Sequence, residues 1–130
     1  MMGPKNVILR NFVWSDEYNE ASFAGRLHED CERNWEEYWL LERALYALAE
    51  PRSAHLELDW PIFKIFSHAF LEINCHFDPD DGIEIIGMDR PTAYNLRERF
   101  QSVFEGYFSN NLPNQKECFD VQNPLLHNKT

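Results

Sequence analysis

The sequence is short of glycine, cysteine and basic side chains, and each shortage argues against a class of function. Its five glycines do not cluster, so it has no glycine-rich loop of the kind that cradles a phosphate. Its three cysteines, Cys31, Cys75 and Cys118, are odd in number and widely spaced, which fits reduced thiols better than a disulfide framework. The chain has 12 basic and 22 acidic residues, so its formal charge is -10. Direct binding to nucleic acid or to an anionic membrane is therefore disfavoured, because both require a cationic surface.

Long apolar runs and catalytic motifs are missing as well. No stretch approaches the roughly 18 apolar residues that span a membrane, and the first residues lack the charged and then apolar layout of a signal peptide. We therefore expect a cytoplasmic protein. There is no paired-cysteine or His-Glu-x-x-His pattern for a metal ion and no Gly-x-Ser-x-Gly elbow for a catalytic serine. These missing patterns predict that the protein is not an enzyme and uses no metal or cofactor.

Two short patterns look like metal sites but fail on spacing. Residues 78–82 read Asp-Pro-Asp-Asp-Gly, yet a calcium loop of the EF-hand type has its glycine at the sixth position rather than the fifth. His68 and His76 are eight residues apart, which turns them about 80° from each other around a helix, so they do not converge well. A turn between helices and ordinary structural histidines are the favoured interpretations.

What the sequence does contain is enough apolar and aromatic surface for one folded domain. Hydrophobic residues make up 44% and aromatic residues 15% of its 130 positions, which excludes a disordered chain. The strongest helix signal covers residues 34–49, where Asn34 can cap the first amides and Glu37 can complete a capping box. An apolar stripe would face the core, and three acids would stay exposed; the stripe is Tyr38, Leu41, Leu45 and Leu48, and the acids are Glu36, Glu37 and Glu42.

Three further helices are predicted from the same kind of periodicity. They cover residues 21–31, a nearly all-apolar and therefore buried segment over 59–77, and residues 89–107. Short segments around Val7, Leu56 and Ile83 are open to a strand or to an irregular connection. The predicted fold is mainly α, a compact bundle of about four principal helices, with a small accessory β-sheet left open. Residues 1–109 would form this domain and residues 110–130 a loosely docked tail, which could dock only through Phe119, Val121, Leu125 and Leu126.

Acidic residues gather around the first two predicted helices. Three precede the first helix, three end it and two open the second; they are Asp16, Glu17 and Glu20, then Glu29, Asp30 and Glu32, then Glu36 and Glu37. The helix dipole explains acids at a helix start, but carboxylates at a helix C-terminus are unfavourable. The second group therefore lacks a structural reason. We predict that these eight residues form a partner-binding surface.

The stretches 12–23, 35–42, 60–63 and 77–82 together resemble a family of small bacterial immunity proteins from polymorphic-toxin and contact-dependent growth inhibition systems. The resemblance covers about residues 7–108 and rests on general pattern rather than on a catalytic signature. It implies a cytoplasmic antidote that binds the toxin domain of a cognate secreted effector, often a nuclease, and blocks its active site. The strong negative charge independently suits a basic, nucleic-acid-binding partner. Immunity families differ in the face they use, so no toxin-contact residue follows from the resemblance.

Two alternatives remain open at this stage. The protein could be an intracellular helical adaptor or regulatory module with a different protein partner. A carboxylate-dependent enzyme ranks last, because it would need a pocket in which acids with raised pKa values converge.

Overall fold

The computed structural model describes residues 3–30, 34–75 and 89–127 of the chain, apart from the side chains of Asp30 and His127. All regular structure in these ranges is helical, which confirms the mainly α prediction. The elements in order are α1 (Pro4–Asn11), α2 (Phe23–Asp30), α3 (Trp35–Leu48), the 3-10 helix η1 (Arg52–Leu58), α4 (Asp59–Cys75), α5 (Arg90–Ser109), α6 (Gln115–Cys118) and α7 (Pro124–His127). In the described part of the chain, no helix is long and apolar enough to cross a membrane.

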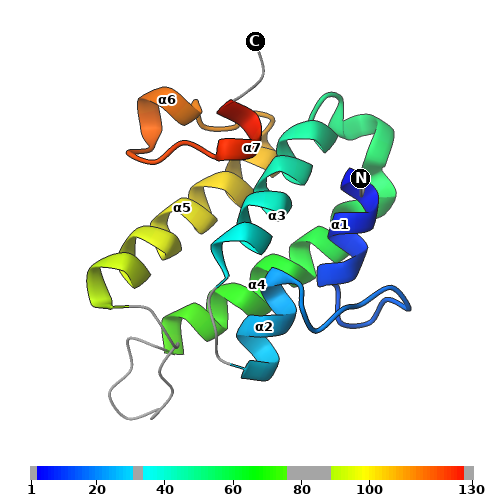
Figure 1. The fold of residues 1–130 in the computed structure, drawn as a ribbon. Helices are drawn as coiled ribbons and strands as arrows, with labels where there is room; N and C mark the ends of the chain where they lie inside the picture. The colour runs from blue at the N-terminus through cyan, green and yellow to red at the C-terminus, as the bar shows by residue number, and fades with distance from the viewer. Residues whose placement is uncertain (1–2, 31–33, 76–88, 128–130) are drawn as a thin grey trace.

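Helix α3 lies in the middle of the fold, with α1 on one side and α5 on the other (Figure 1). Helix α4 packs against α1, α2 and α5. The predicted stripe of α3 does face the core, since Tyr38, Leu41, Leu45 and Leu48 are all buried. A continuous group of aromatic rings joins three helices there, because Phe66 of α4 stacks on Phe100 of α5, and Phe100 packs against Tyr38 of α3.

The predicted cap at Asn34 is present, and Asp89 caps the start of α5 in the same way. The Asn34 side chain accepts a hydrogen bond from the amide of Glu37, and the Asp89 side chain accepts one from the amide of Thr92. The returning half of the predicted capping box is replaced, because the Glu37 carboxylate accepts a hydrogen bond from Arg10 of α1. Capping residues act on amides within one turn, which is why sequence alone finds them well.

The segment around Val7 is a helix, so the strand alternative was wrong there. Pro4 stands in the first turn of α1, where its missing amide hydrogen costs nothing. The helix buries Val7, Ile8 and Asn11, a spacing that suits one helical face, and the Asn11 side chain accepts a hydrogen bond from the amide of Ala24. The segment around Leu56 is the 3-10 helix η1, and the segment around Ile83 lies outside the described residues.

Helix α4 is less buried than its apolar composition suggested. Its inner face, with Ile62, Ile65 and Ile73, belongs to the core. Its outer face exposes Trp60, Phe63 and Leu71, so the prediction that this segment is buried holds only for its inner face. One layer of helices covers α4 on one side only, and its outer apolar side chains remain on the surface.

The segment after α5 returns across α5 and α3. Asn110 ends α5 in the left-handed conformation, with φ at 61°. Gly106 lets the chain come back closely, because a Cβ there would lie 2.8 Å from the Cα of Leu112. One anchor of this segment is polar, because Asn123 is fully buried and its side-chain amide donates a hydrogen bond to the carbonyl of Trp39. Phe119 packs against the core as predicted, but Val121 is exposed and Asn123 is buried, so the expectation that only apolar side chains dock this segment was wrong.

Candidate partner-binding surface

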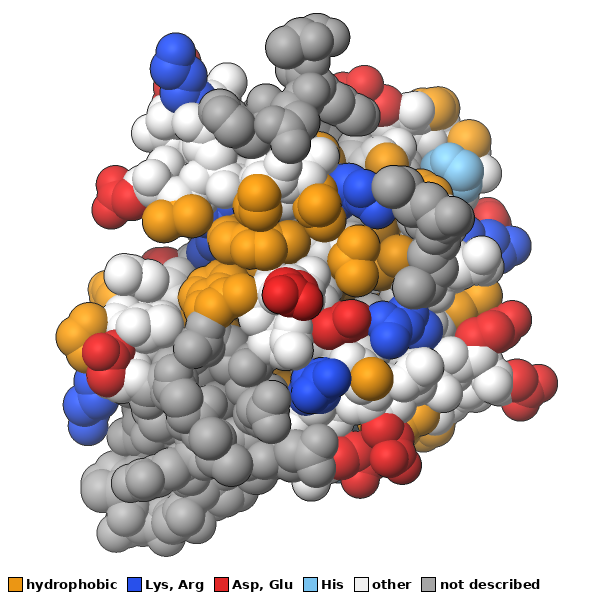
Figure 2. All heavy atoms as spheres, viewed as in Figure 1, with side chains coloured by type: hydrophobic (Ala, Val, Ile, Leu, Met, Phe, Trp, Pro, Cys, Tyr) orange, Lys and Arg blue, Asp and Glu red, His pale blue; other side chains and the backbone are white. Residues whose placement is uncertain are grey.

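The eight predicted acids lie on different parts of the surface. Asp16, Glu17 and Glu20 are exposed in the connection between α1 and α2, Glu29 is exposed in the last turn of α2, and Glu36 is exposed in the first turn of α3. Asp30 ends α2 but its side chain is not described, and Glu32 lies outside the described residues. Figure 2 shows acidic and basic side chains next to each other on the face that carries α2 and the start of α3. The predicted edge is therefore mixed in charge rather than uniformly acidic.

Glu37 is the clearest departure from the predicted surface. Its carboxylate forms an ion pair with Arg10 of α1, and both side chains are largely buried. This contact ties the start of α3 to α1, which gives Glu37 a structural role. Glu17 also has a local role, because it accepts a hydrogen bond of 2.7 Å from the hydroxyl of Ser15. The exposed acids that remain for a partner are Asp16, Glu20, Glu29 and Glu36.

Tyr18 is the residue around which acids from separate segments meet. Its hydroxyl lies 3.5 Å from Oε1 of Glu29, at the limit of a hydrogen bond. Burial raises the pKa of Tyr18, and the negative charges of Glu29, Glu20 and Glu72 raise it further. These carboxylates come from α2, the α1–α2 connection and α4. The acidic region around Tyr18 thus includes Glu72, which the sequence pattern did not indicate and which pairs with His28 of α2.

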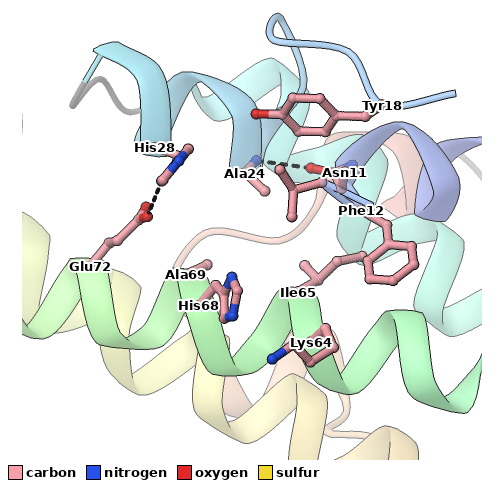
Figure 3. A pocket seen from close by; sticks show the side chains of 11 residues that line it. Asn11, Phe12, Tyr18, Ala24, His28, Lys64, Ile65, His68, Ala69 and Glu72 are labelled. Atoms are coloured by element: carbon pink, nitrogen blue, oxygen red, sulfur yellow. Dashed lines mark hydrogen bonds and ion pairs between the residues drawn. The ribbon is translucent and has the colours of Figure 1, made fainter. Parts of the chain in front are cut away.

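A small cavity lies beneath this region, between α1, α2 and α4 (Figure 3). His28 and Glu72 close one end, with Nδ1 of His28 at 2.7 Å from Oε1 of Glu72. The hydrogen bond to Glu72 raises the pKa of His28 although partial burial lowers it. The cavity volume is about 40 Å³, which has room for water but not for a substrate. No three of the described His, Cys, Asp and Glu side chains are grouped so that they could hold a metal ion.

Two exposed aromatic side chains lie beside Lys64, which lines the cavity. Trp14 is 62% exposed and Trp60 is 56% exposed. The ammonium group of Lys64 lies 4.7 Å from the Trp14 ring centroid and 5.4 Å from that of Trp60, so the two rings hold it by cation–π contacts. His68 packs edge-on against Trp14. Large exposed aromatic side chains of this kind are enriched in protein–protein interfaces.

The most heavily hydrogen-bonded acid is one that the sequence assigned to solvent. Glu42 is 0% exposed, and its two oxygens accept hydrogen bonds from Nε and Nη2 of Arg99 at 2.8 and 2.9 Å. Burial opposes the charge of Arg99, but the hydrogen bonds and charge of Glu42 outweigh it and raise the pKa of Arg99. One signal was present in the sequence, since Glu42 follows Tyr38 by four positions and so shares its buried face.

Comparison with protein-family models, with curated proteins and with solved structures found no match for this chain. The resemblance to immunity proteins therefore rests on the residue pattern of the sequence.

Proposed function

We propose that this protein is an immunity protein that binds the basic toxin domain of a cognate secreted effector, a nuclease, and blocks its active site. The observation that carries the proposal is the exposed Glu29 carboxylate beside the Tyr18 hydroxyl, together with the exposed Glu20 on the α1–α2 connection, on a chain of formal charge -10. A surface of this sign attracts a cationic protein and speeds its association. It also competes with nucleic acid for the same cationic groove.

The exposed acids and the neighbouring aromatic residues have complementary roles in this proposal. Glu20 and Glu29 steer the basic partner toward the surface, because charges at the rim of an interface act mainly on the association rate. Trp14 and Trp60 supply the apolar area that slows dissociation, since buried aromatic anchors carry much of the binding energy in interfaces. Glu37 contributes little, because Arg10 already neutralises it.

The proposed role needs no catalysis, cofactor, direct nucleic-acid contact or membrane. It is a stoichiometric inhibitor that acts in the cytoplasm of the cell that makes the toxin. A gene directly upstream that encodes a large secreted protein with a basic C-terminal domain would support this role. An operon of metabolic enzymes would count against it.

The test uses that basic C-terminal domain as the partner. Co-expression of this protein should rescue growth of cells that produce the domain. The double variant Glu20→Lys/Glu29→Lys should associate about tenfold more slowly at low ionic strength. The matched control is Glu57→Lys/Glu105→Lys, which changes the net charge equally at two exposed positions outside the acidic region. Equal association rates for the two double variants would refute the proposed surface, and circular dichroism would check that both variants are folded.

The adaptor alternative is favoured by one observation, the exposed outer face of α4 with Trp60, Phe63 and Leu71. An adaptor would use this apolar face for a resident partner in its own cytosol. Affinity purification of the tagged protein from its own cells distinguishes the two roles. An adaptor should recover a stable complex in the absence of any toxin, whereas an antidote should not.

A further inference from the structure

A second cavity lies between α3, α5 and the segment 118–121, away from Tyr18. Figure 2 shows it as a cleft entering from the left edge, below the C-terminal segment, with hydrophobic and basic side chains visible inside. Its volume is about 540 Å³, within the range of ordinary ligand pockets. Its lining includes aromatic residues from α3 and the C-terminal segment and acids at its rim, chiefly Trp35, Trp39, Phe119, Glu98 and Asp120.

The walls of this cavity present aromatic rings suited to a cation. Trp35 and Trp39 are stacked, with ring centroids 5.1 Å apart. The protein's own Arg99 already uses this chemistry, because its guanidinium carbon lies 4.7 Å from the Trp39 ring centroid and 4.0 Å from that of Phe119. Ring faces attract cations electrostatically, and a planar guanidinium also stacks well on an indole.

The charge of the cavity is negative although Arg99 contributes to its lining. The Glu42 carboxylate accepts two hydrogen bonds from the guanidinium of Arg99 and balances its positive charge. Glu98 and Asp120 are both exposed, and neither has an ion-pair partner within the described ranges. Two carboxylates beside aromatic walls would repel a phosphate or a carboxylate ligand and attract a cation. The cavity also adjoins the first turn of α3, where Glu36 is exposed.

We infer that this cavity receives an arginine side chain of the basic partner. This inference rests on the proposed function, which supplies a partner rich in cationic side chains. The guanidinium would pack against the aromatic side chains that line the cavity and donate hydrogen bonds to Glu98 and Asp120. Arginine fits better than lysine, because its flat guanidinium both stacks on rings and donates in pairs to carboxylates.

The experiment uses the full chain and a blocked Gly-Arg-Gly peptide as the probe. Two matched peptides replace arginine by citrulline, which has nearly the same shape without the charge, or by lysine. Binding is followed by nuclear magnetic resonance of the indole N–H signals of the four tryptophans, assigned by single Trp→Phe variants. The arginine peptide should shift the signals of Trp35 and Trp39 and leave those of Trp14 and Trp60 in place.

Neutral variants of the rim test the role of charge. Glu98→Gln and Asp120→Asn should each weaken the arginine peptide by about fivefold, as expected for the loss of one partly exposed ion pair. Glu105→Gln is the matched control, because Glu105 is exposed on the same helix but does not line the cavity. The citrulline peptide should bind at least about fivefold more weakly than the arginine peptide, and the lysine peptide should lie between them.

Equal binding of the arginine and citrulline peptides would overturn the inference, and so would unchanged binding by Glu98→Gln and Asp120→Asn together. Shifts confined to Trp14 and Trp60 would overturn it too, because they would move the cation site to the outer face of α4. The peptide experiment needs no toxin, so its failure leaves the growth-rescue test untouched. Conversely, arginine binding in the cavity with no growth rescue would refute the proposed function and keep a cation-binding site.

Discussion

The buried pair of Glu42 and Arg99 makes the sharpest prediction about stability. Glu42 is fully buried and Arg99 is 8% exposed. Replacing Glu42 with Gln removes the negative charge at nearly constant shape and leaves the guanidinium buried without its counter-charge. Loss of one partner of a buried pair costs about 3–5 kcal/mol, because the remaining charge stays desolvated. That is a large share of the roughly 5–15 kcal/mol by which a domain is stable.

The surrounding hydrogen bonds extend the effect to the C-terminal segment. Glu42 also accepts hydrogen bonds from the hydroxyl of Tyr38 and from the side-chain amides of Gln115 and Asn123, each at 3.0 Å. Arg99 in turn donates to the carbonyl of Val121 at 2.5 Å. The Glu42→Gln variant should therefore loosen residues 115–123 first. Faster amide exchange at Asn123, whose N–H bonds to the Gln115 side chain at 2.8 Å, would report this.

The assay is urea unfolding, with the slope of the transition checked for constancy. Glu105→Gln is the control, because an exposed substitution should change the free energy of unfolding by less than about 0.5 kcal/mol. The double variant Glu42→Met/Arg99→Met should be more stable than the less stable of the two single variants Glu42→Met and Arg99→Met, since it leaves no unpaired charge in the core. A loss of less than about 1 kcal/mol in the free energy of unfolding of Glu42→Gln would refute the reasoning. So would a double variant whose loss equals the sum of the losses of Glu42→Met and Arg99→Met.

Three further predictions follow from local contacts. Gly25→Ala should destabilise by about 1–3 kcal/mol in urea unfolding, because its Cβ would lie 2.6 Å from a backbone oxygen, whereas Gly3→Ala, with no atom within 4 Å, should be nearly neutral. Glu72→Gln should lower the pKa of His28 in a nuclear magnetic resonance titration; because Glu72 raises that pKa above 6.5, the contact's stabilisation is complete below pH 6.5 and is lost as pH rises through the folded-state pKa. Burial raises the pKa of Tyr46 to about 12, so the folded state favours the protonated hydroxyl. The stability that this preference contributes is complete below pH 10.0 and is lost as the pH rises toward 12. The Tyr46→Phe variant should lose less stability over that alkaline window, and an unchanged loss would contradict this.

The close contact at Gly25 explains why a glycine stands inside a helix. Gly25 lies inside α2, where glycine costs about 1 kcal/mol relative to alanine. Its missing Cβ lets the backbone of Asn19 and Glu20 lie directly against the helix. Helix propensity is a local quantity, so it cannot register a close approach from a neighbouring segment.

Much of the helical framework could be predicted because its causes are local. Asn34 and Asp89 cap amides within their own first turns, and the stripe from Tyr38 to Leu48 repeats with the period of one helix. The composition likewise determined the sign of the surface charge. The candidate surface was predicted only in part, because the sequence shows how many acids are present but not which of them have partners.

Those partners were decided by tertiary packing between residues far apart in the chain. Arg10 meets Glu37 across 27 positions and Arg99 meets Glu42 across 57, which turns two apparently exposed acids into structural residues. The same packing brings Glu72 to the cavity that Tyr18 lines and gathers Trp39, Arg99 and Phe119 at another. A carboxylate is neutralised by whichever cation lies within a few ångströms, and only the folded chain determines which cation that is.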